Sequence, residues 1–135
     1  MDMHQILHPK SWLPAKGYVN GIAVTGRQVF IAGQIGWDAE QRFASDDFAE
    51  QTDQALANIV AVLTEAGGRP EHIVRLTWYI TDKREYLANL KAVGAAYRRH
   101  IGRHFPTMTM VQVVALIEDR AKVEIEATAV LPVAG

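Results

Sequence analysis

FPTMTMVQVVALIEDRAKVEIEATAVL, residues 105–131, contains two runs in which apolar side chains recur at every second position. Such alternation is typical of β-strands, because successive side chains of a strand point to opposite faces. The charged tripeptide 118–120 separates the two runs, and a three-residue loop there keeps both apolar faces on one side. The pattern therefore predicts an antiparallel hairpin with one core-facing side. The predicted core positions are the odd-numbered ones, which are Val111, Val113, Ala115, Ile117, Val123, Ile125, Ala127 and Ala129.

The even-numbered positions of this stretch would form the opposite face of the hairpin. They are Met108, Met110, Gln112, Val114, Leu116, Lys122, Glu124, Glu126, Thr128 and Val130. This face is too apolar to lie fully in water and too charged for a core, which is typical of a surface that meets a subunit or ligand. Its two carboxylates are candidates for acid–base chemistry. The alternative is an ordinary solvated face, because exposed glutamate is common on proteins.

The composition suits one soluble domain spanning residues 1–135, with 49% hydrophobic and 21% charged residues. A net charge of −1 argues against a broad nucleic-acid surface. The absence of cysteine excludes disulfides and thiolate metal sites. No apolar run is long enough for a membrane span and no signal peptide is recognisable, so we expect a cytoplasmic protein.

A second hairpin is predicted over residues 18–35. The runs YVNGIAV and VFIAGQI flank a polar, glycine-containing segment, residues 25–28. Gly33 lies inside the second run, and an interior strand glycine often marks a bulge or the close approach of a ligand to the backbone. Tight packing alone is the alternative explanation.

An amphipathic helix is predicted after Asp47. Glu50 follows at the spacing of a capping box, and apolar residues then recur at steps of three and four as far as Ala66. The glycine pair 67–68 ends this helix.

Residues 73–81 alternate as a strand, and a second helix is predicted from Tyr86 to Ile101. One face of the strand carries the apolar residues Val74, Leu76, Trp78 and Ile80. The helix ends in basic residues, which suit the negative pole of its dipole. Two histidine pairs have helical spacing, but a proline follows the first and a glycine interrupts the second, so we expect no metal site. These pairs are His4 with His8 and His100 with His104.

The predicted order, β-β-α-β-α-β-β, gives a two-layer α+β domain with about six strands in a mixed sheet and both helices on one face. The other face of the sheet has no covering element in the chain. A partly apolar, uncovered sheet face favours assembly with other copies.

Several segments resemble the reactive intermediate deaminase family, also called RidA or YjgF and, in older usage, L-PSP endoribonuclease. The resemblance extends over nearly the whole chain and depends on the order and spacing of short segments. They are GYVNG at 17–21, AGQI at 32–35, EAG at 65–67, the strand 73–82, Tyr97, Phe105-Pro106 and VEIEA at 123–127.

The resemblance implies a chorismate-mutase-like homotrimer with three clefts at its subunit interfaces. Typical members hydrolyse imine and enamine intermediates to ketoacids and ammonia without a cofactor. It implies that Glu124 handles the attacking water and that Tyr18 and Gly33 line the cleft. Ala32, Gly94, Met108 and Met110 stand at other cleft positions, where typical members carry serine, asparagine, arginine and cysteine.

Met108 is the main departure, because the family arginine at this position clamps the substrate carboxylate. The methionines make the cleft wall flexible and apolar. We therefore expect a ligand other than a small anionic 2-imino acid. An arginine from a neighbouring subunit could replace the clamp, and Arg103 and Arg120 are the nearest candidates in sequence.

Three functions follow from these residues. The first is hydrolysis of a reactive imine or enamine with Glu124 as the base. The second is a trimeric ligand-binding or regulatory protein that keeps the cleft without the chemistry. An endoribonuclease ranks last, because the sequence shows no basic stripe.

Overall fold

The computed structural model of the protein describes residues 4–133, and four of its strands form one mixed sheet in the order β3-β6-β4-β5. These strands are β3 (Arg27–Ile35), β4 (Ile73–Ile80), β5 (Thr107–Gln112) and β6 (Val123–Leu131). The central strand β6 runs antiparallel to β3 and β4, whereas β5 runs parallel to β4 at the edge. Two short strands, β1 (Gln5–Leu7) and β2 (Gly21–Ala23), pair with each other in a separate sheet.

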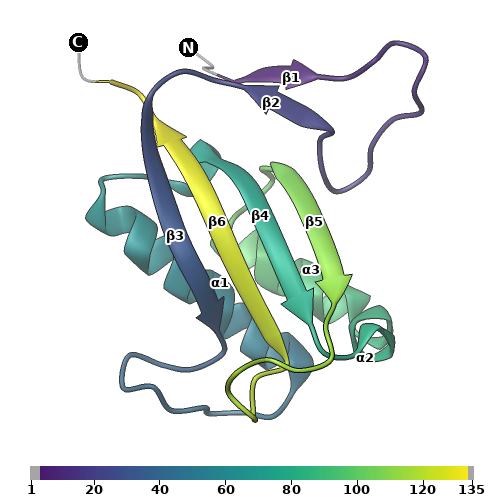
Figure 1. Cartoon of the computed structure of the whole chain (residues 1–135), viewed down its shortest axis with the longest axis vertical. Helices are drawn as coiled ribbons and strands as arrows, with labels where there is room; N and C mark the ends of the chain where they lie inside the picture. Colours follow the sequence, from purple (N-terminus) through teal and green to yellow (C-terminus); the bar gives the residue numbers. More distant parts are fainter. Residues whose placement is uncertain (1–3, 134–135) are drawn as a thin grey trace.

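The helices cover one face of the four-stranded sheet (Figure 1). They are α1 (Phe48–Glu65), α2 (Lys83–Ala88) and α3 (Leu90–His100), with a 3-10 turn at Pro70–His72. The core lies between the layers and includes the fully buried Leu56, Ile59, Leu63, Leu76, Val123 and Ile125. The predicted α+β class, with a mixed sheet and helices on one face, is confirmed. The mixed sheet has four strands rather than about six, because β1 and β2 pair apart from it.

Helix α1 begins and ends as its sequence predicts. The carboxylate of Asp47 accepts a hydrogen bond from the backbone N–H of Glu50 at 2.9 Å and caps the helix. At the other end, Gly67 adopts a φ of 77°, and the N–H of Gly68 bonds to the carbonyl of Leu63. This Schellman motif satisfies the last carbonyls of the helix.

The second predicted helix is divided into α2 and α3. Asn89 interrupts it with φ −123° and ψ 21°, and the Asn89 side chain donates a hydrogen bond to the carbonyl of Glu85. A side chain that bonds to nearby backbone competes with the helical pattern. The prediction of one continuous helix from Tyr86 to Ile101 is therefore wrong.

The hairpin predicted over residues 105–131 is also wrong. Strand β4 lies between β5 and β6, and β5 ends at Gln112, so residues 113–122 form a loop. The parallel register places Met108 beside Leu76 and Met110 beside Trp78, on the helix side. The even positions of β5 therefore face the core, and Val111 points away. The odd positions of β6 are buried as predicted.

The hairpin predicted over residues 18–35 does not form either. β2 pairs with β1 through Ile22 and Ile6, and β3 pairs with β6. The partner strand of β2 comes from the arm before residue 17, although the arm shows no strand periodicity. No helix among residues 4–133 has the length and apolar character needed to cross a membrane.

Candidate functional site

A β-bulge brings the backbone at Gly33 against the carboxylate of Glu124. Ile31 pairs with Ala127 and Gln34 pairs with Ile125, so two residues of β3 oppose one residue of β6. A side-chain carbon built at Gly33 would lie 2.5 Å from Oε2 of Glu124. A bulge was one of the alternatives that the sequence left open at Gly33, and here Glu124 occupies the space that the missing side chain leaves.

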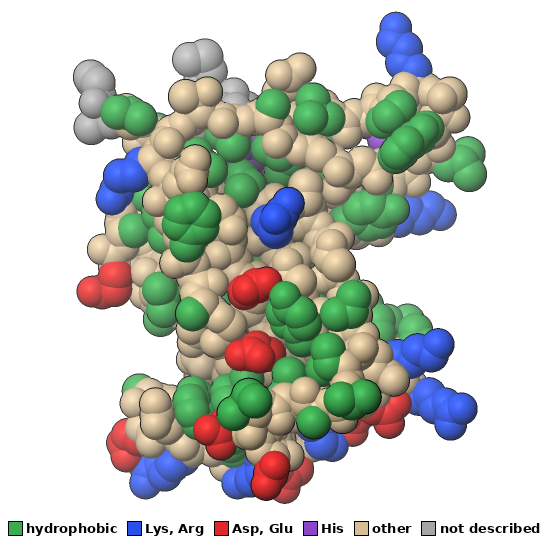
Figure 2. Space-filling model, in the orientation of Figure 1, with side chains coloured by type: hydrophobic (Ala, Val, Ile, Leu, Met, Phe, Trp, Pro, Cys, Tyr) green, Lys and Arg blue, Asp and Glu red, His purple; other side chains and the backbone are tan. Residues whose placement is uncertain are grey.

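The two glutamates of β6 are held differently. The Tyr79 hydroxyl donates a 2.7 Å hydrogen bond to Oε1 of Glu126, and this bond raises the pKa of Tyr79. The Glu124 side chain makes no hydrogen bond or ion pair within the described part of the chain. Figure 2 shows acidic side chains near the middle of this uncovered face, with hydrophobic side chains beside them and a basic side chain above them. Glu124 is therefore the carboxylate that is available to a water molecule or ligand.

The start of β6 is fixed by contacts on the helix side. Oε1 of Gln51, on α1, accepts a hydrogen bond from the backbone N–H of Lys122, and its Nε2 donates to the carbonyls of Ser45 and Arg120. Gln51 is only 1% exposed. The Lys122 ammonium pairs with Glu85 at 2.8 Å, which directs its charge to α2 and away from Glu124. These contacts fix the position of the backbone at Lys122, two residues before Glu124.

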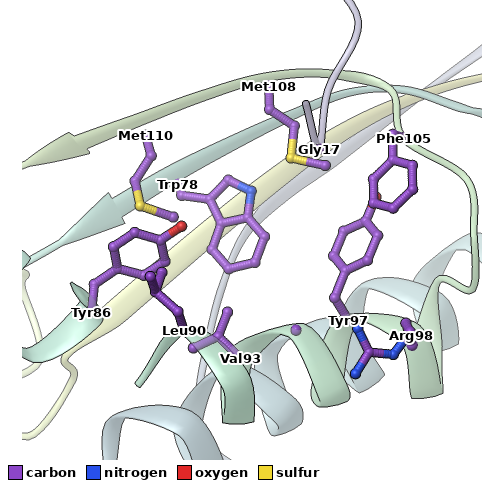
Figure 3. Close-up of a pocket in the computed structure, with 11 residues that line it drawn as sticks. Gly17, Trp78, Tyr86, Leu90, Val93, Tyr97, Arg98, Phe105, Met108 and Met110 are labelled. Carbon is purple, nitrogen blue, oxygen red and sulfur yellow. The ribbon is translucent and has the colours of Figure 1, made fainter. Parts of the chain in front are cut away.

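A second group of predicted residues gathers around the edge strand β5. Met108, Met110 and Gly94 line a cavity of about 200 Å³ between the sheet and helices α2 and α3 (Figure 3). Tyr18 lies outside this cavity, in an adjoining groove that also contains Met108 and Met110. Tyr18 is 41% exposed. These four predicted residues therefore lie near one another around β5, with Gly94 on α3 and Tyr18 in the loop before β2.

The two groups lie on different faces of the sheet. Glu124 pairs with Tyr79 in β4, whereas Met108 pairs with Leu76, three residues away. Because neighbouring side chains of a strand alternate, the two point to opposite faces. β3, which carries Ala32 and Gly33, and β5 also form opposite edges of the sheet. A single chain therefore does not assemble the seven predicted residues into one cleft.

Within one chain, neither of the two arginines suggested for the clamp lines the cavity or the groove. Arg120 pairs with Asp46 at 2.9 Å and lies over the ring of Phe43, 5.3 Å from its centroid. Arg103 is exposed just after α3 and lines neither the cavity nor the groove. Arg98, one helical turn after Gly94, does line the cavity. No sequence motif pointed to Arg98 as a cavity residue.

The histidines bond to other parts of the protein. His100 contacts Asp53 at 3.0 Å, and His104 contacts the carbonyl of Ile73 at 2.6 Å. His8 lies within hydrogen-bonding distance of Trp12 and Asn20. Over residues 4–133, no group of three or more metal-binding side chains is placed to hold an ion.

Residues 9–131 match the family model described as endoribonuclease L-PSP. The chain belongs to this family. A relative within the L-PSP family, the 2-iminobutanoate/2-iminopropanoate deaminase of Salmonella typhimurium, is 34% identical over 116 residues. That alignment covers 84% of this chain and 86% of the relative. The resemblance seen in GYVNG, AGQI and VEIEA is thereby confirmed.

Two solved structures are similar to this one. The Rid protein YyfB from Yersinia pestis, of unknown function, superposes with a TM-score of 0.85 at 31% identity, covering 96% of this chain and 100% of that chain. The structure of E. coli TdcF with bound serine gives a TM-score of 0.67 at 31% identity, covering 94% and 98%. The α+β fold is thus that of the L-PSP family.

Proposed function

We propose that this protein is a hydrolase of imines or enamines in which Glu124 activates the attacking water. The observation that carries the proposal is the state of the two glutamates on the uncovered face. Glu126 is engaged by Tyr79, whereas Glu124 stands unpaired against the bulge at Gly33. A positioned, unpaired carboxylate is suited to general-base catalysis. The Salmonella relative, named as an imine deaminase, supports the same reaction class.

The chemistry requires one carboxylate and one water molecule. Glu124 accepts a proton from water as the water oxygen bonds to the imine carbon, and the electrons of the C=N π bond move to nitrogen. The carboxylic acid then returns that proton to nitrogen. Glu124 next takes the hydroxyl proton and passes it to the amine nitrogen. The C–N bond then breaks, the C=O bond forms, and ammonia leaves. The balance is imine plus water to carbonyl compound plus ammonia, and no cofactor is required.

We further propose that the complete cleft forms between two copies in a homotrimer. Its two halves, Glu124 with Ala32 and Gly33, and Met108 with Met110, Gly94 and Tyr18, lie on opposite faces of one chain. One copy can supply the first half while its neighbour supplies the second. Exposed apolar residues favour such burial: Phe30 on the uncovered face is 74% exposed, and Val114 and Ile117 in the loop after β5 are almost fully exposed.

The experiment compares Glu124→Gln with Glu126→Gln as a matched control. Imines generated from a panel of amino acids by an amino-acid oxidase serve as substrates, and the survival of imine trapped by semicarbazide is measured. Glu124→Gln should lower the rate about 10²- to 10⁴-fold, because it removes the base but keeps the shape. Glu126→Gln should retain most of the activity. Equal rates for the wild type and Glu124→Gln would contradict the proposal.

The same experiment distinguishes the hydrolase hypothesis from the alternative that the protein binds a ligand in the cleft without catalysing a reaction. A binding protein would hydrolyse none of the imines above the rate in buffer, and its affinity for ligand would change little in Glu124→Gln. Cleavage of RNA is not favoured by the charge of the chain, which carries 14 basic and 15 acidic residues.

A further inference from the structure

The cavity beneath β5 is large enough for a ring-sized group. Its volume is about 200 Å³, and an apolar cavity of about 150 Å³ accepts benzene in another protein. Its walls are mostly apolar or aromatic: Met108, Met110 and Trp78 from the sheet, Tyr86 and Val93 from the helices, and Phe105 (Figure 3). Thioether and aromatic walls of this kind suit an aromatic ligand.

One residue that lines this cavity has a buried polar atom without a partner in the described part of the chain. Trp78 is 3% exposed, and its indole Nε1 makes no hydrogen bond within the described chain. Buried donors are almost always paired, because leaving one unpaired forfeits the hydrogen bond it would make in water. Trp78 itself lines the cavity. An acceptor atom on a bound ligand would satisfy this N–H group.

The cavity also carries a single charge, that of Arg98. Nη1 of Arg98 lies 3.4 Å from the point that a side-chain carbon at Gly94 would occupy, so the guanidinium folds over the glycine. No acidic residue lines the cavity. None of the ion pairs found between residues 4 and 133 includes Arg98, whereas the adjacent Arg99 pairs with Asp53 at 3.2 Å. Arg98 can therefore bind a carboxylate.

We propose that this cavity selects a 2-oxo or 2-imino carboxylic acid with a bulky aromatic side chain. The ring packs against the methionine and aromatic walls, the carboxylate binds Arg98, and the 2-oxo or 2-imino group accepts the N–H of Trp78. The claim that such an acid is a substrate rests on the proposed hydrolase function. The claim that the acid binds in this cavity does not depend on that function. An arginine at position 108 would take up part of this space, so Met108 and Arg98 together replace the family clamp with a wider site.

Binding is tested on the full chain by isothermal calorimetry with three probes. They are 2-oxo-3-phenylpropanoate, 2-oxopropanoate, which lacks the ring, and 3-phenylpropan-1-ol, which lacks the carboxylate. The aromatic oxo acid should bind at least ten-fold more tightly than either truncated probe. Equal affinity for 2-oxopropanoate, or no binding of the aromatic oxo acid, would overturn the proposal.

Two variants and one spectrum test the assigned contacts. Arg98→Gln should weaken binding of the aromatic oxo acid about ten-fold or more while leaving the alcohol unaffected, because a charged hydrogen bond is lost. Arg99→Gln, whose arginine is turned to Asp53, is the matched control and should bind normally. The indole N–H resonance of Trp78, identified by its loss in Trp78→Phe, should shift when the oxo acid is added. An unchanged affinity in Arg98→Gln or an unchanged resonance would contradict the assignment.

The two proposals fail in different ways. If the aromatic oxo acid binds but Glu124→Gln leaves imine hydrolysis unchanged, the hydrolase function is wrong and the binding site stands. If Glu124→Gln abolishes hydrolysis but the probe does not bind, the hydrolase function stands and the proposed substrate class is wrong.

Discussion

Oε2 of Glu124 lies so close to Gly33 that a Cβ atom added to this glycine would be 2.5 Å from it. The φ of Gly33 is not in the left-handed region, so its backbone conformation is open to alanine. An added methyl group would displace the side chain of Glu124 and would leave the backbone of β3 in place. The glycine therefore fixes the position of the carboxylate.

Gly33→Ala should lower the imine-hydrolysis rate about 10²-fold, because a displaced catalytic group loses its orientation. The free energy of unfolding should change by less than about 1 kcal/mol. Steady-state rates and urea unfolding measure both effects. In the Glu124→Gln background the same substitution should have no further effect on rate, because coupled residues are not additive. A full additional loss there would show that Gly33 acts independently of Glu124.

Met108→Arg should raise the hydrolysis of small 2-imino acids, which the wild type should turn over weakly. A guanidinium at this position adds a charged hydrogen bond to the substrate carboxylate, worth about 1.5–3 kcal/mol, or roughly ten-fold or more in kcat/KM. Met110→Arg places the same charge two residues further along β5 and should give no gain. Rapid wild-type turnover of 2-iminopropanoate would contradict the role assigned to Met108.

The protein should behave in solution as a trimer of 15.0 kDa chains. Light scattering at micromolar concentration measures the mass. Phe30→Asp places a charge on the uncovered sheet face and should shift the mass toward that of one chain, since burying an unpaired charge is unfavourable. Val62→Asp, on the outer side of α1, should leave the trimer intact. A wild-type mass of one chain would exclude the composite cleft.

Gln51→Leu should destabilise the protein by about 2–4 kcal/mol, because it leaves the backbone groups of Ser45, Arg120 and Lys122 without their partner. Gln54→Leu in the same helix is the control. It removes only a hydrogen bond to Asn58 and should cost less than about 1 kcal/mol. Urea unfolding compares the two, and similar losses would argue against a special role for Gln51.

The pH dependence of stability should reflect Tyr79. Its hydrogen bond to Glu126 raises the pKa of the phenol, so the folded state holds the proton more tightly than the unfolded chain. The resulting stabilisation is complete below about pH 10 and is lost as the pH rises through the folded pKa. Tyr79→Phe should remove this part of the decline. Urea unfolding across the alkaline range measures it, and an unchanged profile in Tyr79→Phe would contradict the assignment.

Local patterns predicted the elements better than their pairing. Asp47 and Gly67 mark the ends of α1 because capping depends on residues within one turn. The alternation in β6 identified its buried face for the same reason. The runs at 105–131 looked like a hairpin because sequence periodicity does not reveal whether another strand inserts between them. Val111 was assigned to the core for this reason, whereas the parallel register with β4 turns Met108 and Met110 inward.

The site residues predicted from the sequence fall into two groups that lie on different faces of one chain. Glu124 and Gly33 meet across β6 and β3, and Met108, Met110 and Gly94 meet beneath β5. Which face each half occupies depends on register, which no motif encodes. Arg98 was missed because its relevance comes from the open space over Gly94, a property of the packed helix.

The central place of β6 also sets the order in which the protein can fold. β3 and β4 are made early in synthesis, yet each has its antiparallel partner only in residues 123–131. Until that segment is available, α1 and β3 have no completed sheet to pack on. Sheet formation is thus a late step that joins contacts distant in sequence, which slows folding and leaves apolar strands unpaired for longer. The unpaired apolar strands of the emerging chain would therefore be most exposed to a chaperone before β6 is made.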